Sequence, residues 1–441
     1  MTPEFAGPAW ARAPWHWTLA EWVAKAALRP AQLLLSAPCF LFLGALTAML
    51  LRHPDVQFYE IDRVAFGLLL LGVIGRAIVL RQELNVFERA SWPMIGLTVL
   101  TLISVAGRPF GQETWSLLAS KFIVPFALFH LAALVFTDEK RLRHFEIFSL
   151  LVLAYLTWTA LAFLFNLRWL VFPHFILDAS VGAHADRARG PLLQAVANGV
   201  SLNVLFLLAL HSYQRSRARG TAMKLLLALV PLAILATMTR SVWLSFAGTV
   251  IALLLLSKRD RSWRLFGGLA VIGASVVALA FGSDQLRYAL RDRLNENKPV
   301  EFRQIVYAGA WDMFLQRPLT GWGFNQMPHE LPRHVPHTNE KALYPHNTYL
   351  ELLAEHGVLG FALYLWLMRE LWKLRSAPVP TNEKAGFLNQ NFHRLWPIIL
   401  AVYWLNAAIV VMSYQFVNAL IFTMAGMLAA QRRRAQMVFP C

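Results

Sequence analysis

The sequence is poor in charged residues and in cysteine. Charged side chains make up 15% of the 441 residues, whereas hydrophobic residues make up 57%. A soluble domain carries about a quarter of its residues as charged side chains, so this composition excludes that class. Together with a mean hydropathy of +0.47, it predicts a polytopic helical membrane protein. The two cysteines, Cys39 in an apolar segment and Cys441 at the end, predict neither a disulfide framework nor a metal cluster.

Motifs of several enzyme classes are absent as well. The sequence has no DxD pair for a metal-bound nucleotide sugar, no HExxH zinc motif, no Walker A phosphate loop and no GxSxG nucleophile turn. The acidic residues of 282–345 show no metal-ligand spacing, and the histidines there would bind a metal only if an irregular loop folded them together. We therefore expect an activity that needs neither a metal nor a cofactor.

Apolar segments of the length needed to cross a bilayer, about 20 residues, run through most of the chain. They predict about 12 transmembrane helices, nine within 31–281 and three within 346–430. The predicted spans are 31–51, 64–80, 91–107, 117–136, 146–167, 191–212, 223–239, 241–257, 265–281, 346–368, 395–412 and 416–430.

Basic residues divide unequally between the two sides of this topology. With a cytoplasmic N-terminus, 24 Lys and Arg lie on the cytoplasmic side and 15 on the other, eight of the latter in 282–345. The positive-inside rule therefore predicts that both termini are cytoplasmic and that 282–345 is one large periplasmic segment. The net charge of +16 is spread over many loops, which favours membrane lipids over nucleic acid as a partner.

Three segments lie outside the predicted spans. Residues 1–30 predict an amphipathic helix in the cytoplasmic interface, with Leu19, Trp22 and Val23 on its apolar face. Residues 431–441 predict a basic cytoplasmic tail. Within 282–345, the apolar residues at helical spacing predict a helix that ends before Pro318: Phe302, Val306, Ala310 and Met313.

Two kinds of residue on the predicted outer side could carry chemistry. His346 follows Pro345 at the outer end of an apolar helix, where the helix dipole favours the neutral imidazole that a general base requires. The alternative is a histidine that caps the helix or bonds a loop carbonyl. Arg189, Arg240 and Arg303 could together clamp a pyrophosphate, because guanidinium forks match phosphate oxygens. Each taken alone also fits a lipid-headgroup anchor.

Four stretches resemble the O-antigen ligase and O-antigen polymerase superfamily of bacterial envelope enzymes. They are RGPLLQAVANG, TMTRSVWL, the run from Arg303 to Gly323, and PHNTYLELLAEHGVLG, and they occur in the family's order. The resemblance implies a C-type glycosyltransferase-like fold in the bacterial inner membrane. It also implies a metal-independent, inverting transfer of a glycan from undecaprenyl pyrophosphate, which in the ligase branch goes to a sugar hydroxyl of lipid A-core.

The resemblance also suggests roles for single residues. His346 matches the family's essential histidine, and Arg189 and Arg240 match its essential arginines, so we expect these three to be catalytic. The remaining candidates are expected to contact substrate: Arg303, Asn198, Asn347, His337 and Tyr344.

Other functions stay open at this point. An O-antigen polymerase would use a second lipid-linked glycan as acceptor, and a third branch of the superfamily uses protein hydroxyls. A lipid-glycan flippase would need a charged cavity across the whole membrane, whereas the candidate charges here gather on one side. In a non-catalytic assembly scaffold, His346 would be dispensable.

Overall fold

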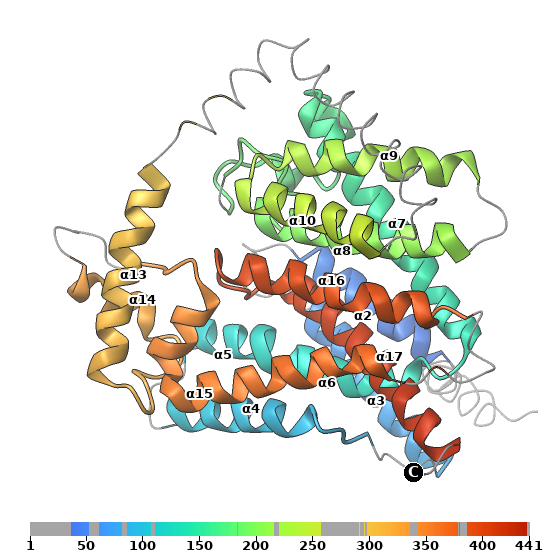
Figure 1. The fold of residues 1–441 in the computed structure, drawn as a ribbon, viewed down its shortest axis with the longest axis horizontal. Coiled ribbons are helices and arrows are strands. Elements are labelled where there is room, and N and C mark those ends of the chain that lie inside the picture. Colours follow the sequence, from blue (N-terminus) through green and yellow to red (C-terminus); the bar gives the residue numbers. More distant parts are fainter. Residues whose placement is uncertain are drawn as a thin grey trace, which may run out of the picture.

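The computed structural model describes residues 37–52, 61–81, 86–106, 111–182, 184–215, 220–256, 291, 295, 298–335, 343–377, 379 and 386–438. Every regular element within these residues is helical, which confirms the all-α prediction (Figure 1). The predicted interfacial helix of residues 1–30 lies outside the described residues, as does the predicted span 265–281.

The helices follow the apolar segments of the sequence. The first half of the chain forms α2 (Pro38–Leu50), α3 (Ile61–Val79), α4 (Ser91–Val105), α5 (Gln112–Leu118), the π-helical η2 (Ala119–Ile123), α6 (Val124–Val135) and α7 (Glu139–Leu164), followed by the short η3 (Arg168–Leu170) and η4 (His174–Leu177). The second half forms α8 (Ala195–Arg215), α9 (Thr221–Ala236), α10 (Arg240–Leu256), α13 (Lys298–Gln316), α14 (Met327–Glu330), η5 (Leu331–His334), α15 (Thr348–Lys373), η6 (Leu374–Ser376), α16 (Gln390–Ala407) and α17 (Gln415–Val438).

Eleven of the twelve predicted spans overlap one of these helices. Four stretches are long and apolar enough to cross a membrane by length and composition: Gln112–Val135, Glu139–Leu164, Ala195–Arg215 and Thr348–Ser376. Four more apolar helices are shorter: α2, α4, α9 and α10. These helices have the character of a membrane protein, while the number of crossings and the side on which each loop lies stay predictions.

Two boundaries differ from the predicted ones. Gly190 and Pro191 do not begin a helix, because Gly190 and Leu193 both take positive φ values, 58° and 52°, and the chain turns once more before α8 starts at Ala195. At the other end, α17 continues to Val438, so Arg432–Arg434 lie on the last helix and not in a separate tail. Arg433 there pairs with Glu88 at 2.9 Å.

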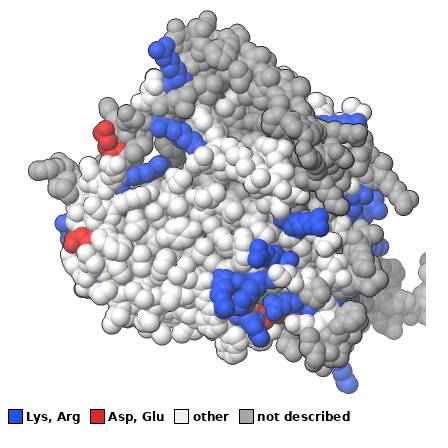
Figure 2. Space-filling model, in the orientation of Figure 1, with Lys and Arg blue, Asp and Glu red and all other residues white. Residues whose placement is uncertain are grey.

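The surface of the bundle separates apolar from charged areas. Figure 2 shows a broad uncharged area that lies between Lys and Arg gathered at the lower right and others near the upper left. Many large apolar side chains, such as Leu71, Ile78 and Leu255, are exposed on the helices. An apolar belt between two charged ends is the surface that a bilayer covers.

Glycines allow the central helices to approach each other closely. A Cβ atom at Gly426 of α17 would lie 2.0 Å from the carbonyl oxygen of Phe129 in α6, and one at Gly199 of α8 would lie 2.3 Å from the Val242 side chain in α10. Small residues at such crossings are typical of membrane bundles, where backbone approach replaces the hydrophobic effect as the source of packing energy. As a result, almost all side chains of α17 from Phe416 to Ala430 are buried.

Residues 298–335, with α13, α14 and η5, form a helical cap at one end of the bundle, beside the start of α15 (Figure 1). Its predicted helix is confirmed as α13, with Val306, Ala310 and Met313 buried. Phe302, which the pattern also assigned to this face, is 44% exposed. The buried face packs against Met327 of α14 and Leu331 of η5, which gives the cap a small apolar core of its own.

The cap is joined to α15 through a break in that helix. Gly357 has φ 64° and ψ −163°, which interrupts the helical hydrogen bonds in the middle of α15. The turn 318–323 supplies the missing partners. The backbone nitrogens of Trp322 and Gly323 donate to the carbonyls of Ala354 and Glu355, each at 2.8 Å. In return, the Val358 nitrogen donates to the Pro318 carbonyl at 2.8 Å.

We predict that Gly357→Ala lowers the thermal unfolding midpoint of the protein in detergent. The alanine Cβ would lie 2.3 Å from the Leu319 carbonyl oxygen, and the positive φ adds a strain of about 1–3 kcal/mol. Gly248→Ala in α10 is the matched control, because a Cβ there meets no atom within 4 Å and alanine favours a helix. Equal midpoints for the two variants would contradict the role of the break.

Candidate functional site

His346 lies immediately before α15 in a backbone conformation that is rare for residues other than glycine. Its φ is 48°, and such outliers persist only where the surroundings hold them. Asn347 is the N-cap of α15, and its side chain accepts hydrogen bonds from the backbone nitrogens of Tyr349 at 2.9 Å and Leu350 at 3.2 Å. Thr348 donates to the Val410 carbonyl at 2.9 Å, so His346 is fixed relative to the end of α16 as well.

The environment of the His346 ring favours its neutral form. Burial is the largest cause that lowers the pKa of His346, followed by the positive charges of Arg303 and His184. The sequence predicted a neutral form from the dipole of the following helix, and the structure adds burial and two nearby positive charges as further causes. A neutral ring has an unprotonated nitrogen, which is what acceptance of a proton requires.

Arg303 and Tyr307 connect the cap to His346. They lie one turn apart on the same face of α13. The Tyr307 hydroxyl lies 3.3 Å from the carbonyl oxygen of His346 and 3.4 Å from that of Ala408, and its one proton is shared between these two acceptors. The structure therefore brings two residues of the predicted site, Arg303 and His346, to one place from segments that are 43 positions apart.

Arg189 is held by the loop that precedes it. Its side chain is 1% exposed, and its Nε donates to the Ile176 carbonyl at 2.9 Å. Its two terminal nitrogens donate to the carbonyls of Val181 and Asp178. A guanidinium has five N–H groups, so at least three of those of Arg189 order the loop 176–190 in this conformation.

The loop that carries Arg189 is also tied to the end of α9. The Ala188 nitrogen donates to the Ala236 carbonyl at 3.1 Å, at the end of α9. Arg240, half-buried, is the first residue of α10 four positions later. Asn198 is fully buried and donates to the Ala188 carbonyl at 2.9 Å, so its side chain positions this loop.

The structure places the other residues that were predicted to contact substrate in different environments. Tyr344 is 50% exposed two residues before His346. Asn347 serves as the helix cap described above, and His337 lies outside the described residues. Direct contact of these residues with a substrate stays a prediction.

The sequence did not single out His184 or Tyr307. Tyr307 could have been found, because it lies four residues after Arg303 and so shares its face of a predicted helix. No pattern in the sequence indicated that the loop around His184 approaches His346.

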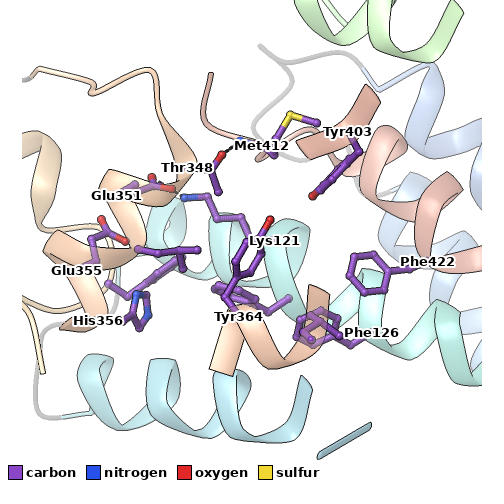
Figure 3. A pocket seen from close by; sticks show the side chains of 14 residues that line it. Lys121, Phe126, Thr348, Glu351, Glu355, His356, Tyr364, Tyr403, Met412 and Phe422 are labelled. Carbon is purple, nitrogen blue, oxygen red and sulfur yellow. Dashed lines mark hydrogen bonds and ion pairs between the residues drawn. The ribbon is translucent and has the colours of Figure 1, made fainter. Parts of the chain in front are cut away.

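A buried polar cluster lies inside the first turns of α15 (Figure 3). The Lys121 Nζ atom lies 2.7 Å from Oε1 of Glu351, and both side chains are about 10% exposed. Glu355, one turn further along α15, accepts hydrogen bonds from the backbone nitrogens of Asn325 and Met327. Figure 3 shows that Lys121, Glu351 and Tyr403 point toward a common cavity of about 40 Å³, which is large enough for water.

Among the described residues, no three His, Cys, Asp or Glu side chains gather in a way that could hold a metal ion. His334 pairs with Asp312 at 2.6 Å and packs its ring against Trp322. Independence from metal stays a prediction, because His337 and other residues of the cap are outside the described part.

Comparison with known proteins supports the superfamily that the sequence motifs suggested. Residues 225–365, which include Arg240, Arg303 and His346, match the family model described as O-antigen ligase. Over 174 residues the chain is 25% identical to an O-antigen ligase of Salmonella typhimurium (strain LT2). That match covers 37% of this chain and 41% of the Salmonella protein, so the chain matches less than half of the length of this curated relative. The resemblance to the O-antigen ligase superfamily is thereby confirmed.

We predict that Glu351→Gln destabilises the protein by about 3 kcal/mol, because it leaves Lys121 charged in a buried site. This is the lower end of the usual range, since Glu355 remains near Lys121. Thermal unfolding in detergent measures the effect. Glu330→Gln in the cap is the control, because its partner Arg333 is 74% exposed at the side chain and exposed pairs contribute about 0–1 kcal/mol. A midpoint for Glu351→Gln as high as that of the control would refute the buried ion pair as a stabilising element.

Proposed function

We propose that this protein is an O-antigen ligase of the bacterial inner membrane. It transfers a polysaccharide from undecaprenyl pyrophosphate to a sugar hydroxyl of lipid A-core on the periplasmic face, without a metal and with inversion at the anomeric carbon. The observation that carries the proposal is His346, kept neutral by burial and by Arg303 within the region that matches the ligase family.

The proposed reaction is a direct displacement. The acceptor hydroxyl oxygen attacks the anomeric carbon of the donor while the bond from that carbon to the pyrophosphate oxygen breaks. The hydroxyl proton moves to the free ring nitrogen of His346, and the bonding electrons leave with the pyrophosphate. The donor already carries a good leaving group, so the step needs no other energy source. Attack opposite to the departing oxygen inverts the anomeric carbon.

The arginines have different parts in this proposal. The negative charge that grows on the departing pyrophosphate is stabilised by Arg240 and Arg303, which are less enclosed than Arg189. Arg189 orders the loop 176–190 and can offer a phosphate at most two of its five N–H groups in this conformation. In this proposal, Arg189 therefore also acts on donor binding indirectly, because it positions His184 and the backbone of the same loop.

The decisive experiment uses the purified protein with lipid-linked O-antigen and, in parallel, two acceptors. Transfer to lipid A-core in excess chelator supports the ligase. Transfer only to a second lipid-linked glycan would instead indicate a polymerase, and movement of the donor across vesicles without transfer would indicate a flippase. Loss of transfer in chelator with rescue by one metal would overturn metal independence.

We predict that His346→Ala lowers the transfer rate about 10²–10⁴-fold, because general-base assistance to the acceptor hydroxyl is lost. Binding of the lipid-linked donor, measured separately, changes little because the arginines remain. His329→Ala is the control, since this histidine is exposed on α14 and has no assigned role in the site. If His346→Ala keeps more than roughly a tenth of the rate, the assignment of the base is wrong.

We predict that Arg303→Gln moves the acidic limb of the pH–rate profile to higher pH. The charge of Arg303 contributes to the lowered pKa of His346, so its removal lets that pKa rise. The neutral base then disappears at a higher pH as the solution is acidified. Arg303→Lys keeps the charge and the position of the limb, but it lowers the rate because an ammonium group lacks the guanidinium fork.

Arg333→Gln is the control for this profile, because Arg333 lies in the same cap but pairs with Glu330. If the pH–rate profile of Arg303→Gln keeps the wild-type acidic limb, then the charge of Arg303 does not lower the pKa of His346, and the prediction is wrong.

A further inference from the structure

A groove with a charged mouth runs between α3 and the stretch formed by α5 and η2. Its cavity has a volume of about 310 Å³. Arg52, Asp62 and Arg63 lie at the mouth, where α2 ends and α3 begins. The groove is separate from the cavity in Figure 3, which has no lining residue in common with it.

The mouth of the groove is built as an anion site. Arg52 donates to the side chain of Gln415 at 3.0 Å and to the Ser116 hydroxyl at 3.2 Å, which fixes its guanidinium. Asp62 is only 2% exposed and lies 3.6 Å from Arg52, so it balances one of the two arginines. Arg63 is exposed, so the described charged residues that line the groove, two arginines and one aspartate, carry a net positive charge. Guanidinium groups suit a phosphate, and two of them line this groove.

The interior of the groove is apolar. Phe66 and Gly67 of α3 face Ile123 and Val124 across it. An apolar channel that leads from a cationic mouth along a helix matches a lipid, with the phosphate at the mouth and an acyl chain in the channel. A free phosphate ion has no apolar part that could occupy the channel.

A second groove differs from the first in its chemistry. It lies between α4 and α15, has a volume of about 460 Å³, and is lined by apolar residues alone, among them Val99, Leu363 and Trp366. A polyprenyl tail is a single apolar chain, and this second groove suits it. The donor pyrophosphate is assigned above to Arg240 on α10 and Arg303 on α13, neither of which lines the charged groove. The charged groove is therefore available to the other phosphorylated lipid of the proposed reaction.

The mouth of the charged groove adjoins the segment that supports His346. Gln415, which binds Arg52, begins α17 directly after the segment 408–414. That segment receives the hydrogen bond from Tyr307 at Ala408, and its Met412 nitrogen donates to Thr348 at 2.9 Å. A lipid at the mouth would thus present its headgroup beside the same segment that holds the start of α15.

We propose that this groove binds the acceptor lipid, an acylated and phosphorylated glycolipid. A phosphate of the acceptor binds between Arg52 and Arg63, and an acyl chain lies along Phe66 and Gly67. This inference rests on the proposed ligase function for the identity of the lipid. It adds a site for the acceptor that is distinct from the residues assigned to the donor and to proton transfer.

Gly67→Leu tests the channel directly. A Cβ at Gly67 meets no atom within 4 Å, so the leucine side chain enters the groove without displacing the protein. We expect the KM for the acceptor lipid to rise about tenfold, whereas the KM for the donor and the rate at saturating acceptor stay the same. Gly44→Leu is the matched control, because Gly44 of α2 is equally unobstructed and does not line the groove. Equal acceptor KM values for both variants would overturn the proposal.

Arg63→Gln tests the mouth. We expect Arg63→Gln to raise the KM for the acceptor about tenfold, because a charge-assisted contact is lost. With a dephosphorylated acceptor, the variant and the wild type should have the same KM. If the groove instead holds an ordinary anionic phospholipid, Gly67→Leu and Arg63→Gln will change how activity in nanodiscs depends on phosphatidylglycerol. The acceptor KM will then stay unchanged in both variants. This outcome would also overturn the proposal.

A binding measurement separates this proposal from the proposed function. Native mass spectrometry of wild type, Gly67→Leu and Gly44→Leu with lipid A-core reports binding even if no transfer occurs. Loss of binding in Gly67→Leu alone supports the groove whatever reaction the protein performs. Retained binding in Gly67→Leu excludes the groove even if the wild type proves to be a ligase.

Discussion

The break in α15 at Gly357 is the constraint on which the arrangement of the site depends. In a membrane, backbone groups that a helix leaves without partners must find them within the protein, because lipid offers none. The turn 318–323 provides these partners. The cap is therefore part of the membrane bundle, and its α13 is brought against the start of α15. The proximity of Arg303 to His346 follows from this backbone pairing more than from any contact between the two side chains.

The charges around the site are held by the protein before any substrate arrives. Arg189 is fixed by backbone carbonyls, and Lys121 is fixed by Glu351 directly beneath the first turn of α15. Burial of such charges opposes folding unless partners compensate for the lost solvation. Once compensated, they need not reorganise when charge develops on a leaving group, and that lack of reorganisation is the main source of electrostatic catalysis. Fixed charges here thus serve both stability and the proposed chemistry.

The sequence predicted what depends on local pattern. Apolar runs located the helices, and the spacing of Val306, Ala310 and Met313 located α13. Lys121 and Glu351 were recognisable as charged residues within apolar segments, and their pairing could have been predicted because a bilayer leaves them few alternatives. The approach of His184 to His346, and the carbonyls around Arg189, depend on how loops fold in three dimensions. The helix start predicted at Pro191 was wrong because the positive φ of Leu193 adds a turn that no residue type there requires.

The proposed reaction between two membrane lipids poses a problem that a soluble enzyme does not meet. Both reacting groups must reach one base at the membrane surface while both apolar tails stay in the bilayer. One groove cannot serve both, since the two tails would exclude each other. Two grooves with different chemistry resolve this conflict: an uncharged one between α4 and α15 and a cationic one between α3 and α5. In this proposal the difference in charge also gives selectivity, because the arginines of the charged groove can bind a phosphate and the uncharged groove has no such residue. In this proposal, the arginines that line the charged groove select the acceptor lipid, and His346 accepts the proton in the transfer step.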